Sequence, residues 1–169
     1  MWTMIEGFEH LESDEFDNLL DAPALITVLV GAADGHLDRE ERTWSERLLR
    51  TRTYNHPKQL NEFYRVVVEG FWVKVHGFMA ELPTDTEARG QEISRRLAKL
   101  NTIFPKLEPK LAADIYKGFL GLAEETAEAS GGFLHLGAIS VEERQWINLP
   151  MLTPVVMERT SQEEVVVED

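Results

Sequence analysis

The sequence contains no cysteine, so disulfides, thiolate zinc sites, iron–sulfur clusters and cysteine nucleophiles are all excluded. Direct reduction of a substrate by a protein thiol is excluded for the same reason. Positive charge is scarce as well, because 17 Lys and Arg stand against 30 Asp and Glu and give a net charge of −13. This charge repels polyanions. We therefore expect no nucleic-acid partner, and we favour metal cations or basic proteins and peptides as partners.

Long hydrophobic runs are absent too. The apolar stretch at 22–33 is shorter than the roughly twenty residues that a bilayer-spanning helix needs. The longer stretch at 66–82 is interrupted by Glu69, Lys74 and His76. We therefore expect no membrane span. Residues 1–21 carry many carboxylates and no Lys or Arg, which is the opposite of a secretory signal, so we expect a cytoplasmic protein.

Apolar residues recur at helical spacing along most of the chain. Residues 17–33 are apolar on nearly every side, which predicts a central buried helix, with Asp21 as its cap and Pro23 in its first turn. A strand at 25–30 is the rival interpretation, but no second strand with hairpin chemistry exists to pair with it. The fold class we predict is therefore all-α, a single-domain bundle of about six to seven helices.

Turn residues divide the rest of the chain into further helices. Asn55 and Pro57 predict the start of the longest helix, and Pro83 predicts its end. Thr84 and Glu87 form a capping-box pattern for the next helix. The predicted core stripes of these two helices are Leu60, Phe63, Tyr64, Val67, Phe71, Val75, Phe78 and Leu82, then Ile93, Leu97, Leu100 and Phe104.

Three regions are expected from composition. Residues 1–16 are an acidic lead-in, either docked as a short helix or loosely attached, and residues 17–156 form the helical domain. Residues 157–169 contain an acidic run and predict an exposed tail. The domain is long enough to bury one core and too short for two.

The most chemically distinctive segment is the acidic turn at 32–42, AADGHLDREER. Gly35 is typical of a helix stop, and Asp38 with Glu41 is a capping box for the helix that follows. Asp34 is not explained in this way, because a carboxylate at the C-terminal end of a helix faces the negative end of its dipole. It therefore requires a cation, which is either a metal ion or a side chain such as Arg42 or His36.

A similar segment occurs later in the chain. Residues 38–44, DREERTW, recur in kind as residues 140–146, SVEERQW, and each copy follows an apolar helix that ends in a glycine turn. The repetition predicts two similar helix–turn–helix units, a pseudo-duplication within the bundle. The second copy keeps Glu143 but carries Ser130 in place of the first acidic residue.

An apolar helix followed by Ala-Asp-Gly and a Glu-Glu pair resembles the TerB-like tellurite-resistance family, over residues 19–149. The resemblance implies an all-α bundle, a metal-binding surface on paired acidic turns, and a role in tellurite or general stress response. It also implies protein partners, with peripheral membrane-linked complexes among them, and it establishes no enzymatic activity. The implied metal ligands are Asp34, Asp38, Glu41 and Glu143.

Oxygen ligands of this kind suit calcium or magnesium better than zinc. The turn is not an EF-hand, because His36 and Arg39 occupy positions that need an oxygen ligand and a glycine. Two alternatives remain open beside the non-catalytic module. One is a metal-dependent enzyme of unknown substrate that uses the same four carboxylates, and the other is an interaction adaptor in which the turn is only scaffold.

Overall fold

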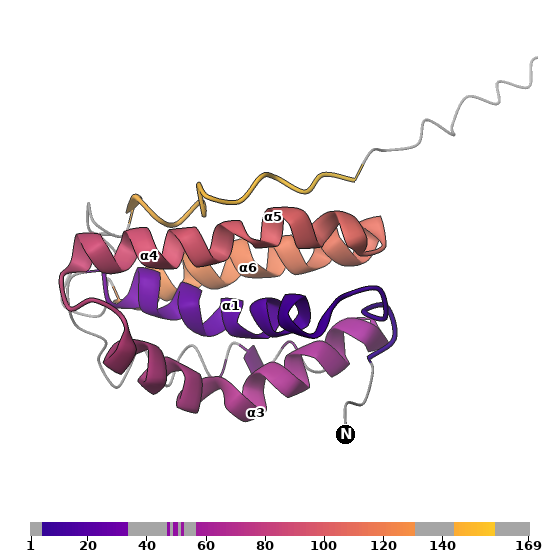
Figure 1. The fold of residues 1–169 in the computed structure, drawn as a ribbon, viewed down its shortest axis with the longest axis horizontal. Coiled ribbons are helices and arrows are strands. Elements are labelled where there is room, and N and C mark those ends of the chain that lie inside the picture. The colour runs from indigo at the N-terminus through magenta and orange to yellow at the C-terminus, as the bar shows by residue number, and fades with distance from the viewer. Residues whose placement is uncertain are drawn as a thin grey trace, which may run out of the picture.

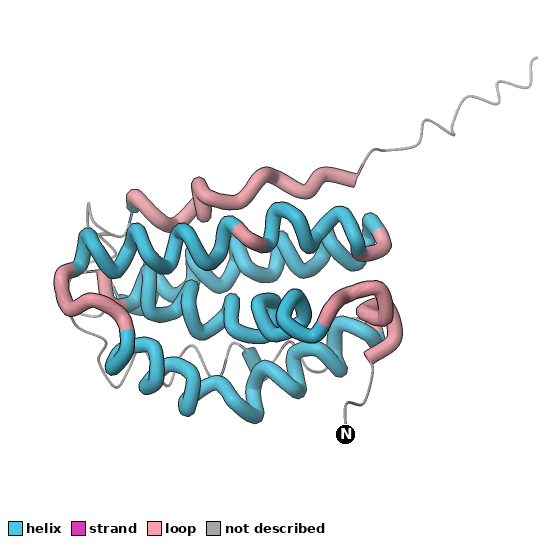
Figure 2. Tube along the Cα trace, in the orientation of Figure 1, coloured by secondary structure: helices cyan, strands magenta, loops and turns pink. Residues whose placement is uncertain are grey.

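The computed structural model describes residues 5–33, 47, 49–50, 52, 57–130 and 144–157. Its helices are α1 (Ser13–Gly31), α3 (Lys58–Glu81), α4 (Thr86–Ala98), the short α5 (Leu100–Ile103) and α6 (Pro109–Ser130), with a 3-10 turn, η1 (Phe104–Lys106). The described residues contain no strand (Figure 2). The all-α prediction is therefore confirmed for this part of the chain. The predicted six to seven helices and the pseudo-duplication depend on residues outside it.

Helix α1 is the centre of the bundle (Figure 1). It contacts α3 on one side and α4, α5 and α6 on the other. From Leu19 to Gly31 nearly every residue is buried, as expected for a helix that is apolar all round. The prediction of a central buried helix is confirmed.

The predicted start of this helix was wrong. Helix α1 begins at Ser13, and the backbone N–H of Glu12 donates to the Glu15 carboxylate at 2.9 Å. Glu12 and Glu15 therefore satisfy backbone N–H groups at the start of the helix, which lies eight residues before Asp21. Pro23 lies in the helix interior, where it has no N–H to donate to the preceding turn. The Thr27 hydroxyl donates to the Pro23 carbonyl at 2.9 Å in the same buried region.

The chain before α1 takes part in the core from residue 5 onward. Ile5 and Phe8 are buried. The Phe8 ring stacks on Phe63 of α3 at 5.5 Å between centroids and meets Phe16 edge-on at 5.4 Å. These aromatic contacts attach the start of the chain to α1 and α3 at one end of the bundle.

Proline sets the limits of α3 as predicted. Pro57 is its N-cap residue, and the helix ends at Glu81, two residues before Pro83. The predicted core stripe is confirmed, since all of its residues in α3 are buried or packed against the core. The capping residue of α4 is Asp85, whose carboxylate accepts from the Ala88 N–H at 2.8 Å. The prediction of Thr84 was wrong by one residue.

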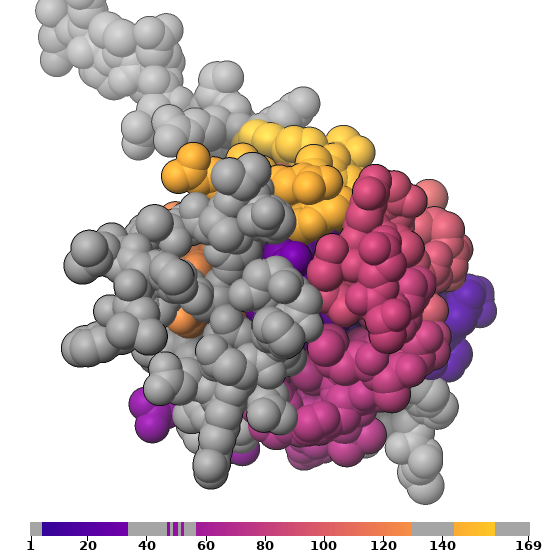
Figure 3. Space-filling view, turned by 90° about the vertical axis from the view of Figure 1, so that its left-hand side faces the viewer, coloured from indigo at the N-terminus to yellow at the C-terminus, as the bar shows by residue number. Residues whose placement is uncertain are grey.

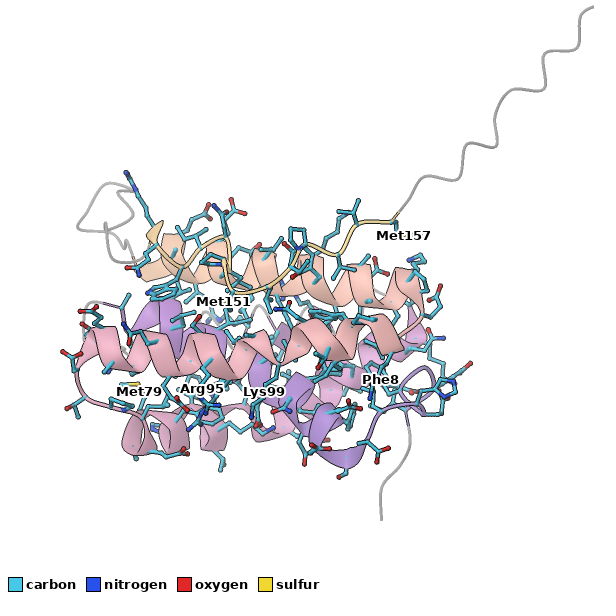
Figure 4. All side chains as sticks on the ribbon, turned by 45° about the horizontal axis from the view of Figure 1, so that its top comes forward. Phe8, Met79, Arg95, Lys99, Met151 and Met157 are labelled. Atoms are coloured by element: carbon cyan, nitrogen blue, oxygen red, sulfur yellow. The ribbon has the colours of Figure 1, made fainter. Side chains whose placement is uncertain are left out.

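Residues 144–157, which we call the C-terminal segment, lie along the outside of the bundle over α4, α5 and α6 (Figures 1 and 4). Leu149 and Leu152 insert into the core. The Asn101 side chain of α5 holds the backbone on either side of Leu152, because its amide donates to the Met151 carbonyl at 2.9 Å and its oxygen accepts from the Thr153 N–H at 2.8 Å. The segment is thus fixed by both apolar and polar contacts.

Candidate functional site at the end of α1

The four predicted metal ligands, Asp34, Asp38, Glu41 and Glu143, lie outside the described residues. Within the described ranges, no three His, Asp or Glu side chains come together as a metal site would require. The metal prediction therefore stays a prediction. The described residues that border these positions in the chain are Ala33, directly before Asp34, and Arg144, directly after Glu143.

The structure places a cation at the C-terminal end of α1. Arg89 of α4 donates from Nη2 to the carbonyl of Ala32, the C-cap residue of α1, at 2.6 Å. Arg89 is only 6% exposed. The terminal carbonyls of a helix carry the negative end of its dipole, so a guanidinium there is stabilising and also satisfies an acceptor that lacks an intrahelical donor.

The sequence predicted Arg42, His36 or a bound metal as the cation beside Asp34; all of these positions lie outside the described residues, and the prediction did not include Arg89. A signal was present, because Arg89 lies one turn before Ile93 and two turns before Leu97 on the buried face of α4. A charged residue on a core stripe requires a buried acceptor. That acceptor is 57 positions away in the chain, and no local pattern identifies it.

The space beside Arg89 is a cavity of about 260 Å³, which we call the α1-end cavity. Its floor consists of buried apolar residues, Leu29 and Ala33 of the α1 end and Ile93 of α4. The half-buried Trp146 forms a wall, and Arg89 lines the interior. The exposed rim carries the polar residues Thr86, Glu87, Gln91 and Gln145. Figure 3 looks onto this end of the bundle, where α4 and the C-terminal segment flank the end of α1.

Trp146 reaches this position because α4 has a glycine opposite it. A Cβ atom placed on Gly90 would lie 2.8 Å from Cζ2 of the Trp146 ring, which is closer than carbon atoms approach without a shift. The indole therefore packs directly on the α4 backbone. This contact joins the C-terminal segment to the cavity.

The α1-end cavity also brings together two chain segments that are far apart in the sequence. Ala33 directly precedes Asp34 of the acidic turn, and Gln145 and Trp146 are the last residues of the segment at 140–146. These residues line one cavity. The described residues that lead into the acidic turn and the end of the later segment therefore lie at the same end of the bundle.

A second arginine contact lies between the segment before α3 and α6. Arg52 donates from Nη1 to the Gly118 carbonyl at 2.6 Å, and its guanidinium lies 5.6 Å from the centroid of the Tyr64 ring. Burial raises the pKa of Tyr64 above its usual value, and the neighbouring Arg52 offsets part of this rise. A Cβ atom on Gly118 would overlap the Tyr64 hydroxyl. This cluster is part of the packed core, and it lies on other elements than the α1-end cavity.

The fold and the cavity define an all-helical bundle with a small, partly polar cavity at one end. No family model, curated protein or solved structure matches the chain. None of the described helices is both long and apolar enough to cross a membrane.

Proposed function

We propose that this chain is a non-catalytic module of the TerB-like type, acting in tellurite or general stress response. Its acidic turn binds a divalent cation, a protein partner, or both. The observation that supports the proposal is the meeting of Ala33 with Gln145 and Trp146 at the α1-end cavity. A surface built from paired acidic turns requires that the two copies lie at the same end of the bundle.

The proposed ligands are Asp34, Asp38 and Glu41 from the first copy and Glu143 from the second. Asp34 directly follows Ala33, and Glu143 precedes Gln145 by two residues, so both belong to chain segments that border the cavity. Calcium and magnesium prefer several carboxylate and carbonyl oxygens, which such a set supplies. The protein's net charge of −13 adds a general attraction for cations and for basic partner surfaces.

Arg89 bears on this proposal because it already supplies positive charge at the end of α1. Arg89 therefore offsets the unfavourable interaction between the Asp34 carboxylate and the negative end of the α1 dipole. Because a protein side chain already offsets the dipole, any metal affinity should come from the oxygen ligands of the turn and not from the helix dipole.

Isothermal titration of the full chain with Ca²⁺, Mg²⁺ and Zn²⁺ tests the proposal. We expect saturable heat with Ca²⁺ or Mg²⁺ and an accompanying rise in melting temperature, because a ligand that binds only the native state stabilises it. Asp34→Ala should abolish both effects. Glu69→Ala, which removes an exposed carboxylate on α3, should leave them unchanged.

Absence of heat and of any melting shift with all three ions would remove cation binding from the proposal. The same absence would favour the adaptor alternative, in which the turn is scaffold. Equal losses in Asp34→Ala and Glu69→Ala would show that the ions respond only to overall charge.

A further inference from the structure

We propose that the α1-end cavity binds a small organic carboxylate, with the carboxylate on Arg89 and the apolar part of the ligand against Trp146. The proposal concerns an anionic ligand at described residues, and it is separate from cation binding by the acidic turn. The Arg89 side chain is more than nine-tenths buried and lines the cavity.

The guanidinium of Arg89 has unused capacity to donate. Arginine carries five N–H donors, and one of them is committed to the Ala32 carbonyl. In the portion of the chain that the structure describes, no carboxylate lies within ion-pair distance of Arg89, whereas Arg95 and Arg96 on the same helix both pair with Glu92. Among the described residues the buried guanidinium therefore has spare donors and no counter-ion. An anion in the cavity could accept from these donors.

A carboxylate suits this position because guanidinium and carboxylate groups pair in a fixed planar geometry. The N-terminal end of α4 is already capped by the Asp85 carboxylate, so the attraction for a ligand anion comes from Arg89. The 13-residue α4 begins at Thr86, which lies on the cavity rim.

The remaining walls define the rest of the ligand. Leu29, Ala33 and Ile93 form an apolar floor, and the Trp146 indole offers a flat aromatic surface. The cavity combines an apolar floor with one buried charged group and a polar rim, and small-molecule sites use the same elements. At about 260 Å³ it is near the lower limit of such sites, so the ligand must be small.

Glu87 on the rim provides an internal control. Its exposed carboxylate lies at the entrance and opposes the approach of an anion. Removing the charge at Glu87 should therefore strengthen carboxylate binding, whereas removing the charge at Arg89 should weaken it. A purely structural role for Arg89 predicts no such opposite effects.

The test uses phenylacetate as the probe and its neutral analogue phenylacetamide as the control ligand. We expect saturable binding of phenylacetate to the full chain by calorimetry, together with a shift of one indole N–H signal that is missing in Trp146→Phe. Phenylacetamide should bind at least about tenfold more weakly, the lower end of what losing a charge-assisted contact costs.

Three variants complete the test. Arg89→Gln keeps an amide that can donate to Ala32 and should weaken phenylacetate binding about tenfold or more. Glu87→Gln should tighten it. Arg95→Gln removes an exposed arginine that is paired with Glu92 on the flank of α4 away from the C-terminal segment, and it should change nothing (Figure 4).

Equal binding of phenylacetate and phenylacetamide to the unmodified protein would overturn the proposal, and so would the absence of saturable binding. These two outcomes need no variant, so they hold even if Arg89→Gln unfolds. Equal weakening by Arg89→Gln and Arg95→Gln would reduce the effect to non-specific charge and would also refute it.

Discussion

Replacing Gly118 with alanine should destabilise the protein, although the same replacement usually stabilises a helix. Gly118 lies inside α6, where alanine is favoured over glycine by about 1 kcal/mol. The added methyl group would overlap the Tyr64 hydroxyl, which is fully buried beside Arg52. Overpacking of this kind costs about 1–3 kcal/mol. Because the buried ring has little room to retreat, we expect the upper part of that range and a net loss of about 1–2 kcal/mol.

The assay is urea unfolding with thermal melting as a second measurement. A loss of that size corresponds to a fall in melting temperature of about 2–8 °C for a chain of this length. Gly77→Ala on α3 is the matched control, because Gly77 is exposed and a Cβ there would meet no atom within 4 Å. It should raise stability by about 0.5–1 kcal/mol through helix propensity alone.

A double-mutant cycle isolates the contact. Tyr64→Phe removes only the hydroxyl oxygen that the new methyl group would meet. In that background Gly118→Ala should become neutral or stabilising, so the two substitutions should be strongly non-additive. Gly118→Ala that stabilises the unmodified protein as much as Gly77→Ala does, or that has the same effect in both backgrounds, would refute the reasoning.

Two further predictions concern α4. The methyl group added by Gly90→Ala should contact the Trp146 ring and lower the free energy of unfolding by up to about 1 kcal/mol. The loss should be smaller than at Gly118 because the half-buried indole can move outward. Urea unfolding and the chemical shift of the indole N–H measure the effect, and an unchanged indole signal would contradict the contact. Hydrogen bonds from Arg95, and to a smaller extent from Arg96, lower the pKa of Glu92 from 4.5 to about 2. A lowered native pKa gives stability that is fully present above pH 4.5 and lost as pH falls toward 2, so Glu92→Gln should flatten the melting temperature against pH in that window. Parallel curves for the two proteins would count against the pairing.

Long regular patterns in the sequence were sufficient to predict much of the fold. The stripe from Leu60 to Leu82 repeats over six turns between two prolines, and a pattern of that length allows only one buried face. Helix starts were harder because several residues compete for the cap. Thr84, Asp85 and Thr86 are all good caps, and only the bond from the Ala88 N–H to Asp85 decides among them.

The start of α1 was predicted wrongly for a different reason, which concerns Pro23. Proline is most common in the first turn of a helix, and that preference placed the start of α1 too late. The surrounding core overrides the preference, because α1 is buried against α3, α4 and α6 along the residues that flank Pro23. The apolar run at 17–33 indicated this burial, but the positional preference of proline alone does not include the effect of packing.

The predicted metal site and the α1-end cavity involve opposite charges at one end of α1, and this has a thermodynamic consequence. Arg89 is a fixed positive charge beside the point where the acidic turn leaves Ala33, so it opposes a divalent cation in that turn. A carboxylate bound to Arg89 would neutralise this charge and ease cation binding. By linkage the bound cation would strengthen carboxylate binding by the same factor. If both ligands bind as proposed, their affinities must therefore rise together, and independent affinities would mean that the cation does not lie near Arg89.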